Sequence, residues 1–300
     1  MTPEISLITP CYKMEKYLHL FLKKLPEQTI FKKIEVILDH NEPTQKEIKL
    51  VKNFQRKYPN RIKHIIKKKV KPIGISMNDC IKFSKGKYLA IWNVDDIRTN
   101  DSLELQYNAL KNNKNYGFAF GDYKIVKSFG STNGVIIKHD KNCLKSLKSS
   151  MKLGPFFMFK KKLVKKMGFF DEQLLSGADF DFAIRLAYTT KGVIIKKLLG
   201  YYLNEGKGAS TRPLSLQAEE SNFIHFRYGI FSKVTKAIYY LPTLINYDHK
   251  NYSFFNKRYA IDDYFRDYQK IITKKIVKYQ NENNNKRLLL KIYQKLRIYK

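Results

Sequence analysis

Short apolar runs alternate with longer amphipathic segments along the first 115 residues of the chain. The apolar runs predict buried β-strands; they are Ile5–Pro10, Ile34–Leu38, Ile62–Ile66 and Tyr88–Val94. The segments between them space apolar residues three or four apart, which predicts helices; these cover residues 15–25, 45–58 and 74–85. We expect Pro10 to end the first strand, because proline cannot donate a hydrogen bond to a neighbouring strand. Strands that alternate with helices predict a parallel sheet covered on both faces.

The pattern changes near residue 116. Three further apolar runs follow without a long helix between them, at residues 117–122, 134–137 and 154–159. Helical spacing then returns over residues 161–167 and 179–187, and again in the basic, aromatic segment after about residue 213. The predicted fold class is therefore α/β, with a mixed, mainly parallel sheet flanked by helices. We expect one domain over residues 1–213, with halves of about 1–115 and 116–213, and a basic helical C-terminal region over residues 214–300.

The chain carries a large excess of positive charge. Its 300 residues include 58 Lys+Arg against 26 Asp+Glu, a net charge of +32, while 43% hydrophobic residues indicate a folded protein. Such an excess attracts polyanions, either nucleic acid or an anionic lipid surface. A lysine-rich surface that binds no partner accounts for the same numbers equally well.

Cysteine usage and the absence of long apolar segments indicate the compartment. Cys11, Cys80 and Cys143 are odd in number and widely spaced, which fits neither a disulfide framework nor a zinc motif. The first residues lack the layout of a signal peptide, and no window approaches the ~20 apolar residues of a membrane-spanning helix. We expect a cytoplasmic protein that can lie at the inner face of the membrane, because residues 231–241 and 271–279 mix lysine with aromatic residues as membrane-surface helices do. An ordinary helical cap on the main domain would have the same composition.

Two adjacent acids, Asp95 and Asp96, follow the apolar run that begins at Tyr88. Neighbouring carboxylates repel each other, so one of them needs a cation or a strong donor to stay ionised. A hard divalent ion held against a substrate phosphate suits their oxygens. The alternative is an acidic turn before the next helix, which begins near Asp101.

Polar side chains also occur at other predicted strand ends, where α/β sheets bind ligands. Thr9 and Tyr12 lie at the end of the first strand, and Asp39 follows the second. Asp179 and Asp181 begin a predicted helix, whose dipole favours an ionised carboxylate and hence a general base. Turn formation and helix capping are the competing interpretations of each position.

Together these motifs resemble the GT-A fold glycosyltransferases of family 2, which are inverting enzymes that use nucleotide sugars. The resemblance covers roughly residues 4 to 212, and no single motif is specific. The motifs are Ser6–Tyr12, Glu27–Thr29, Ile34–Asp39, Gly74–Asn78, Lys85–Ala90, Asp95–Asp96, Gly168–Glu172 and Asp179–Leu186. The resemblance implies transfer of a sugar from a nucleotide-sugar donor, with UDP favoured, to a hydroxyl of a glycan, lipid-linked or protein-linked acceptor.

On the donor side, the resemblance implies roles for individual residues. Thr9, Tyr12 and Asp39 would hold the uracil-type base, and Asn93 stands where the family usually has the acid that faces the ribose. Asp95 stands at the metal-binding position of the DxD motif, which implies Mn²⁺ or Mg²⁺, and the neighbouring Asp96 would support this turn.

On the acceptor side, the resemblance implies that Asp179 deprotonates the acceptor hydroxyl, while Asp181 and Arg185 support the site. The chain departs from the family pattern at Asn93 and at Ala178, which occupies a position that is often Glu. These departures leave open a catalytically silent relative that acts as a binding subunit.

A nucleic-acid-binding protein is the less favoured alternative. Only the net charge of +32 supports it, and no recognition-helix, RNA-binding or zinc pattern occurs in the sequence. The acids Asp39, Asp95 and Asp179 would also repel a phosphate backbone.

Overall fold

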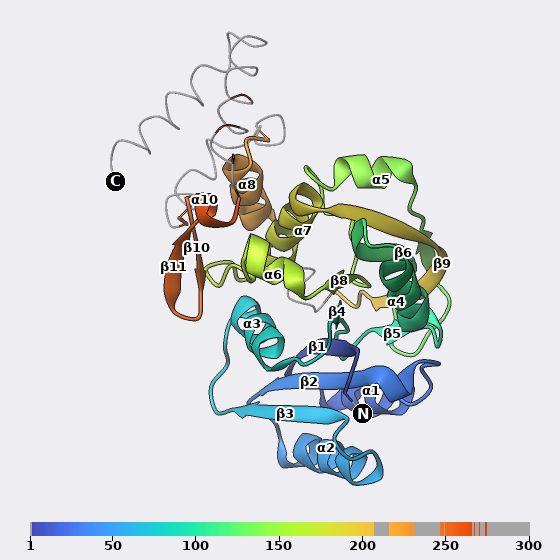
Figure 1. Ribbon diagram of the computed structural model, residues 1–300. Coiled ribbons are helices and arrows are strands. Elements are labelled where there is room, and N and C mark those ends of the chain that lie inside the picture. The colour runs from blue at the N-terminus through green and yellow to red at the C-terminus, as the bar shows by residue number, and fades with distance from the viewer. Residues whose placement is uncertain are drawn as a thin grey trace.

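A computed structural model describes residues 2–206, 216–230, 247–248, 250–265, 267, 270 and 274 of the chain. Within these residues, the centre of the molecule is a nine-stranded sheet with the order β3-β2-β1-β4-β8-β6-β9-β5, and β7 pairs with β6. Helices cover both faces of the sheet (Figure 1). The predicted α/β fold class, a mixed sheet flanked by helices, is confirmed.

The first half of the sheet is parallel, because each strand connects to the next through a helix. β1 pairs with β2 on one side and with β4 on the other, and β3 pairs with β2. The strands are β1 (Ile5–Tyr12), β2 (Ile34–Asn41), β3 (Ile62–Lys67) and β4 (Tyr88–Ile91). The helices are α1 (Glu15–Lys24), α2 (Gln45–Lys57), α3 (Ile73–Phe83) and the short 3₁₀ helix η1 (Phe31–Lys33). The carboxyl ends of these four strands therefore meet at one edge of the sheet.

The second half of the sheet mixes strand directions. β8 (Met158–Lys160) runs antiparallel to both β4 and β6, whereas β6 and β9 are parallel to each other. The strands of this half also include β5 (Ile97–Arg98), β6 (Tyr116–Val126), β7 (Val135–Ile137) and β9 (Lys191–Leu203). Its helices are α4 (Ser102–Asn112), α5 (Lys141–Ser146), α6 (Lys162–Met167) and α7 (Ala178–Thr189).

Separate hydrophobic clusters lie on the two faces of the sheet. One cluster packs α1, α2 and α4 against β1, and the other packs α3, α6 and α7 against the opposite face. The second cluster also takes in α8 (Gln217–Arg227), the hairpin of β10 (Asn251–Phe254) and β11 (Lys257–Ala260), and α10 (Ile261–Tyr264). The described residues after position 213 therefore share the core of the preceding domain, and the division at residue 213 stays a prediction.

Pro10 does not end the first strand, contrary to our expectation. β1 continues to Tyr12, and Pro10 pairs with Asp39 of β2. The backbone groups of Ile8 are directed toward β4, since its carbonyl accepts from the N–H of Trp92. Pro10, two residues later, is directed to the same side, where β4 has already ended at Ile91. The missing N–H of proline therefore leaves no partner unsatisfied.

Other elements also differ from the sequence prediction. β9 was not anticipated, and the predicted strand over residues 154–159 is reduced to β8. The C-terminal region, which was predicted to be helical, contains the β10–β11 hairpin. The basic segment 231–241 lies outside the described residues, and in the segment 271–279 the structure describes only residue 274. No helix in the described ranges is both long and apolar enough to cross a membrane.

Candidate functional site

The predicted donor-side residues meet at the carboxyl ends of three neighbouring parallel strands. Thr9 lies on β1, Asp39 lies on β2, and the turn that contains Asp95 follows β4. Burial, together with carboxylates that include those of Asp95 and Asp39, raises the pKa of the Cys11 thiol at the end of β1. Because the charges of Asp39 and Asp95 both act on the Cys11 thiol, the two carboxylates lie at the same edge of the sheet.

Asp39 is completely buried, and its carboxylate already has hydrogen-bond and ion-pair partners within the protein. The Asn41 amide donates to Oδ1 over 3.0 Å, and the Lys67 ammonium lies 3.0 Å from Oδ2. Lys67 also pairs with Asp79. Burial raises the pKa of Asp39, while Lys67 opposes this shift. The contact of Asp39 with a nucleobase stays a prediction, and it would require the carboxylate to leave these partners.

The turn after β4 gives its two acids different environments. Asp96 is buried, and its carboxylate accepts from the Leu203 N–H over 3.1 Å and from the Asn93 amide over 3.2 Å. Burial and then the charge of Asp95 raise the pKa of Asp96 well above its usual value. Asp95 remains partly exposed, and desolvation and the charge of Glu205 raise its pKa. Asp96 thus holds the turn, whereas Asp95 keeps contact with solvent.

The surroundings of Asp95 fit a hard divalent cation. The charge of Asp95 raises the pKa of Asp96, and that of Glu205 raises the pKa of Asp95, so a cation here would relieve mutual repulsion. Glu205 accepts from the Lys16 ammonium over 3.0 Å and from the Tyr17 hydroxyl over 2.8 Å. Divalent ions of this kind are commonly held by one or two carboxylates together with substrate phosphates. Asp95 can therefore hold such an ion once a diphosphate supplies further oxygens.

A second group of metal-ligand side chains lies nearby. The ligand atoms of Cys11, His40 and Glu47 are within 4.8 Å of one another, and all three residues are buried. Glu47 already accepts from the Thr44 N–H over 2.7 Å and from the Met14 N–H over 3.1 Å. Burial lowers the pKa of His40 and raises that of Cys11, so both are neutral at neutral pH. The thiol and imidazole suit thiophilic metals better than Mg²⁺.

Thr9 and Tyr12 differ in their surroundings. Thr9 is completely buried, and its hydroxyl oxygen has no hydrogen-bond partner in the part of the chain that the structure describes. Tyr12 is partly exposed, with the Lys13 ammonium 5.1 Å from its ring centroid. Tyr12 thus offers an aromatic face at the end of β1, while Thr9 carries an unused polar group within the same strand.

Asp179 lies in the first turn of α7, and its side chain is exposed. The surrounding protein still desolvates the carboxylate, and this is the main cause that raises its pKa to about 6. The charge of Glu220 adds to the shift, while the Phe180 N–H, which donates to Asp179 Oδ1 over 2.8 Å, opposes it. Asp179 is therefore mostly ionised at neutral pH and more basic than an ordinary aspartate, as a general base requires.

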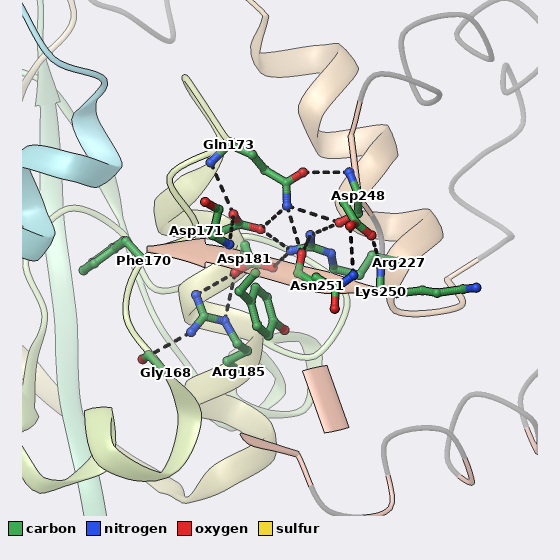
Figure 2. A network of polar contacts seen from close by, with 12 residues as sticks. Gly168, Phe170, Asp171, Gln173, Asp181, Arg185, Arg227, Asp248, Lys250 and Asn251 are labelled. Atoms are coloured by element: carbon green, nitrogen blue, oxygen red, sulfur yellow. Dashed lines mark hydrogen bonds and ion pairs between the residues drawn. The ribbon is translucent and has the colours of Figure 1, made fainter. Parts of the chain in front are cut away.

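Asp181 is the centre of a buried charge network (Figure 2). Arg185 Nε donates to Asp181 Oδ2 over 2.8 Å, and Arg227 Nη1 donates to Asp181 Oδ1 over 2.9 Å. Arg227 also donates to Asp171 Oδ2 over 2.8 Å, and the Tyr228 hydroxyl donates to Asp181 Oδ1 over 2.8 Å. Although burial opposes it, the two guanidinium groups lower the pKa of Asp181. The network joins α7 to α8 and to the loop before α7.

Sequence analysis identified only part of this network. The i, i+4 spacing of Asp181 and Arg185 indicates a helical pair, and the structure forms it. Arg227 is 46 residues from Asp181 and 56 from Asp171, so no local pattern connects it to either acid. The sequence shows these acids but not their burial, so it gives no signal that Arg227 is their partner.

Helix α3 links the donor-side edge of the sheet to the loop before α7. The Asn41 amide donates to Ser76 Oγ over 3.1 Å. Asn78 donates to the Phe170 carbonyl and accepts from the Phe170 N–H, each over 2.8 Å. Among the described residues, no hydrogen bond or ion pair joins Asp179 directly to the donor-side acids. The position of Asp179 relative to Asp95 therefore depends on α3 and the charge network.

Sequence comparisons identify related proteins. The model of a family described as "Glycosyl transferase family 2" matches residues 6–168. An uncharacterized glycosyltransferase of Methanocaldococcus jannaschii is 30% identical over 67% of this chain and 70% of its own length. A poly(ribitol-phosphate) beta-glucosyltransferase of Bacillus spizizenii is 25% identical over 66% of this chain. The match spans only 32% of the length of this Bacillus protein.

Solved structures share the fold. Residues 1–349 of S. aureus TarS, in complex with UDP-GlcNAc, match with a TM-score of 0.61 at 17% identity, over 81% of this chain and 71% of that one. The mannosyltransferase PcManGT of Pyrobaculum calidifontis, in complex with GDP-Man and Mn²⁺, matches with a TM-score of 0.57 at 14% identity, over 82% and 70%. Both likenesses support the predicted GT-A arrangement.

The charge network generates a prediction about stability. Arg227→Met removes the guanidinium that Asp171 and Asp181 share and leaves two buried carboxylates, so the free energy of unfolding should fall by about 3–5 kcal/mol. Urea denaturation measures this change. The control, Lys46→Met, breaks the exposed pair with Glu15 and should leave the free energy of unfolding almost unchanged. Equal losses in the two variants would contradict the role of the network.

Proposed function

Because the chain belongs to glycosyl transferase family 2, we propose that it is an inverting enzyme that moves a sugar from a nucleoside diphosphate, with UDP favoured, to an acceptor hydroxyl. The observation that carries this proposal is the pair of Asp95 and Asp179. Asp95 is a partly exposed acid at the carboxyl ends of parallel strands, and Asp179 is an exposed acid at the start of a helix with a pKa of about 6. The first suits a metal–diphosphate and the second suits a general base.

The donor is a nucleotide sugar in this proposal, with Mn²⁺ or Mg²⁺ on Asp95. Complexes of proteins with the same fold support the class of donor, since one contains UDP-GlcNAc and another contains GDP-Man with Mn²⁺. When bound, the metal supplies positive charge to the diphosphate, which stabilises the leaving group. Thr9, Tyr12 and Asp39 would hold the base, and Asn93 would lie near the ribose.

The transfer itself is a single displacement. Asp179 accepts the proton of the acceptor hydroxyl as that oxygen forms a bond to the anomeric carbon. The bond between the anomeric carbon and the diphosphate oxygen breaks, and the nucleoside diphosphate leaves with the bonding electrons. Because attack and departure are on opposite sides of the sugar, the anomeric configuration inverts. Asp181 and Arg185 act indirectly by fixing the helix that carries Asp179.

We propose an anionic glycan polymer as the acceptor class. A hollow of about 980 Å³ lies at the amino-terminal end of β4, opposite the edge that carries Asp95. No acid among the described residues lines it, and its lysines are Lys82, Lys85, Lys87, Lys111, Lys114, Lys160, Lys161, Lys162 and Lys165. Such a cluster attracts phosphate groups along a polymer chain, and one relative is named for poly(ribitol-phosphate). The hollow would retain a long acceptor while its end reaches the catalytic edge.

Two carboxylate variants should separate donor binding from transfer. Asp95→Asn should weaken Mn²⁺-dependent binding of UDP-sugars and GDP-sugars, because it removes the charge that holds the cation. Asp179→Asn should leave donor binding intact and reduce transfer by about 10²–10⁴-fold, the usual contribution of a general base. Calorimetric titration of the donor and release of nucleoside diphosphate measure the two effects.

Asp101→Asn is the matched control, since Asp101 is exposed and makes no capping hydrogen bond. It should resemble the parent in both assays. If the Asp95 and Asp179 variants also match the parent, the assigned site is wrong. Donor binding without turnover in the parent, across all acceptors, would instead favour the catalytically silent relative suggested by Asn93 and Ala178.

The raised pKa of Asp179 predicts the pH dependence of transfer. A general base works only when it is ionised, so kcat/KM should fall about tenfold per pH unit below a pKa of about 6. Initial rates between pH 4.5 and 8 at saturating Mn²⁺ would measure this decrease in kcat/KM. An activity that stays level down to pH 4.5 would contradict Asp179 as the base.

The lysine hollow predicts a salt-dependent affinity for polyanions. The triple variant Lys111→Gln, Lys114→Gln and Lys165→Gln should bind inorganic polyphosphate several-fold more weakly and with a shallower salt dependence. A control triple on α2, which replaces the exposed Lys49, Lys52 and Lys57 by Gln, removes equal charge elsewhere. Fluorescence anisotropy measures both. Equal losses in the two triples would show a general charge effect and would overturn the proposed acceptor site.

A further inference from the structure

A buried acid from α8 holds the start of the helix that carries Asp179. Glu220 is completely buried, and its carboxylate accepts from the N–H groups of Leu175, Ser176 and Gly177 over 2.7, 2.7 and 2.5 Å. The Tyr247 hydroxyl donates to the same carboxylate over 2.9 Å. These three N–H groups lie immediately before α7, where backbone donors otherwise need a capping side chain or water.

The start of α7 lacks a cap of its own. Gly177 occupies the N-cap position without a side-chain hydrogen bond, and the next residue, Ala178, is not acidic. The first turn of α7 carries Asp179 and Asp181, and Glu220 adds a carboxylate from another element that binds the N–H groups before the helix. The start of α7 packs closely against α8, since a Cβ added at Gly177 would lie 3.1 Å from Glu220 Cβ and 2.9 Å from Ile224 Cδ1.

Among the residues that the structure describes, few other charged groups lie near Asp179. On its own helix, Asp181 is paired with Arg185 and Arg227 in the buried network. On α8, the His225 ring packs on Phe180 at 5.3 Å between centroids and lies 3.1 Å from the Ser149 carbonyl. Glu219 acts on Tyr247, which itself donates to Glu220. Desolvation is the main cause of the raised pKa of Asp179, and the charge of Glu220 adds to it.

We propose that Glu220 is the positioning residue of the catalytic base, because its carboxylate fixes the backbone from which Asp179 projects. This inference rests on the proposed function, in which Asp179 takes the acceptor proton. It also gives the departure at Ala178 a structural meaning: the acid missing before Asp179 in the sequence is replaced by one from α8, 42 positions later.

Glu220→Gln tests the inference with little change in shape. The amide has one acceptor oxygen in place of two and carries no charge. The backbone before α7 should therefore be held less rigidly, and the pKa of Asp179 should fall. We expect kcat to decrease about tenfold, the acidic limb of the pH profile to move to lower pH, and donor KM to stay unchanged. Glu219→Gln removes the same charge one residue away and should leave kcat, KM and the pH profile as in the parent.

An NMR titration of the Asp179 carboxyl carbon provides a readout that does not need turnover. In Glu220→Gln the titration midpoint should move to lower pH, whereas Glu219→Gln should leave it in place. An unchanged midpoint and unchanged kcat in Glu220→Gln would overturn the positioning role. Equal shifts of the Asp179 midpoint in both variants would also overturn the positioning role, because a general effect of charge would then explain the shift.

The same experiments distinguish this inference from the proposed function. If Asp179→Asn abolishes transfer while Glu220→Gln has no effect, only the positioning role fails. If Asp179→Asn transfers sugar at the parental rate, the base assignment fails and the positioning role fails with it. If Glu220→Gln unfolds at a much lower temperature than the parent, the titration can be run where the variant is still folded. The midpoint of Asp179 then still tests the positioning role of Glu220.

Discussion

One guanidinium group, shared by two buried carboxylates, joins α8 to α7 and to the loop before α7. Arg227 of α8 donates to Asp181 on α7 and to Asp171 in the preceding loop. Burying such charges is favourable only when every partner is present, because each lone ion in the interior costs several kcal/mol. The segments must therefore assemble together. The direction of α7, and with it the position of Asp179, follows from this assembly.

The parallel half of the sheet could be predicted from the sequence, because each strand is a continuous apolar run followed by an amphipathic helix. β9 could not, since its pairing with β6 changes register near Asp122, and Lys196 and Lys197 interrupt its apolar pattern at the surface. The β10–β11 hairpin lies in a region whose lysine and aromatic content favours a helix as much as a strand. Pro10 was misjudged because its effect depends on where the neighbouring strand ends.

Some residues of the candidate site could likewise be predicted from the sequence, and others could not. Asp95, Asp96 and Asp179 could be located because they follow strands or begin a helix, and Arg185 because it lies one helical turn from Asp181. The roles of Glu220 and Arg227 could not be predicted, since each contacts backbone or acids more than 40 residues away. Burial is equally invisible in sequence: Asp39 and Asp95 look alike as strand-end acids, yet only Asp95 remains accessible.

We propose that Asp95 and Asp179 act on one donor from opposite sides. Crystals grown with Mn²⁺ and a non-hydrolysable nucleotide sugar, measured at the manganese absorption edge, test it directly. We expect an anomalous peak next to the Asp95 carboxylate and the diphosphate, with Asp179 facing the anomeric carbon from the side opposite the leaving group. Manganese at the group of Cys11, His40 and Glu47, or a sugar bound out of reach of Asp179, would contradict it.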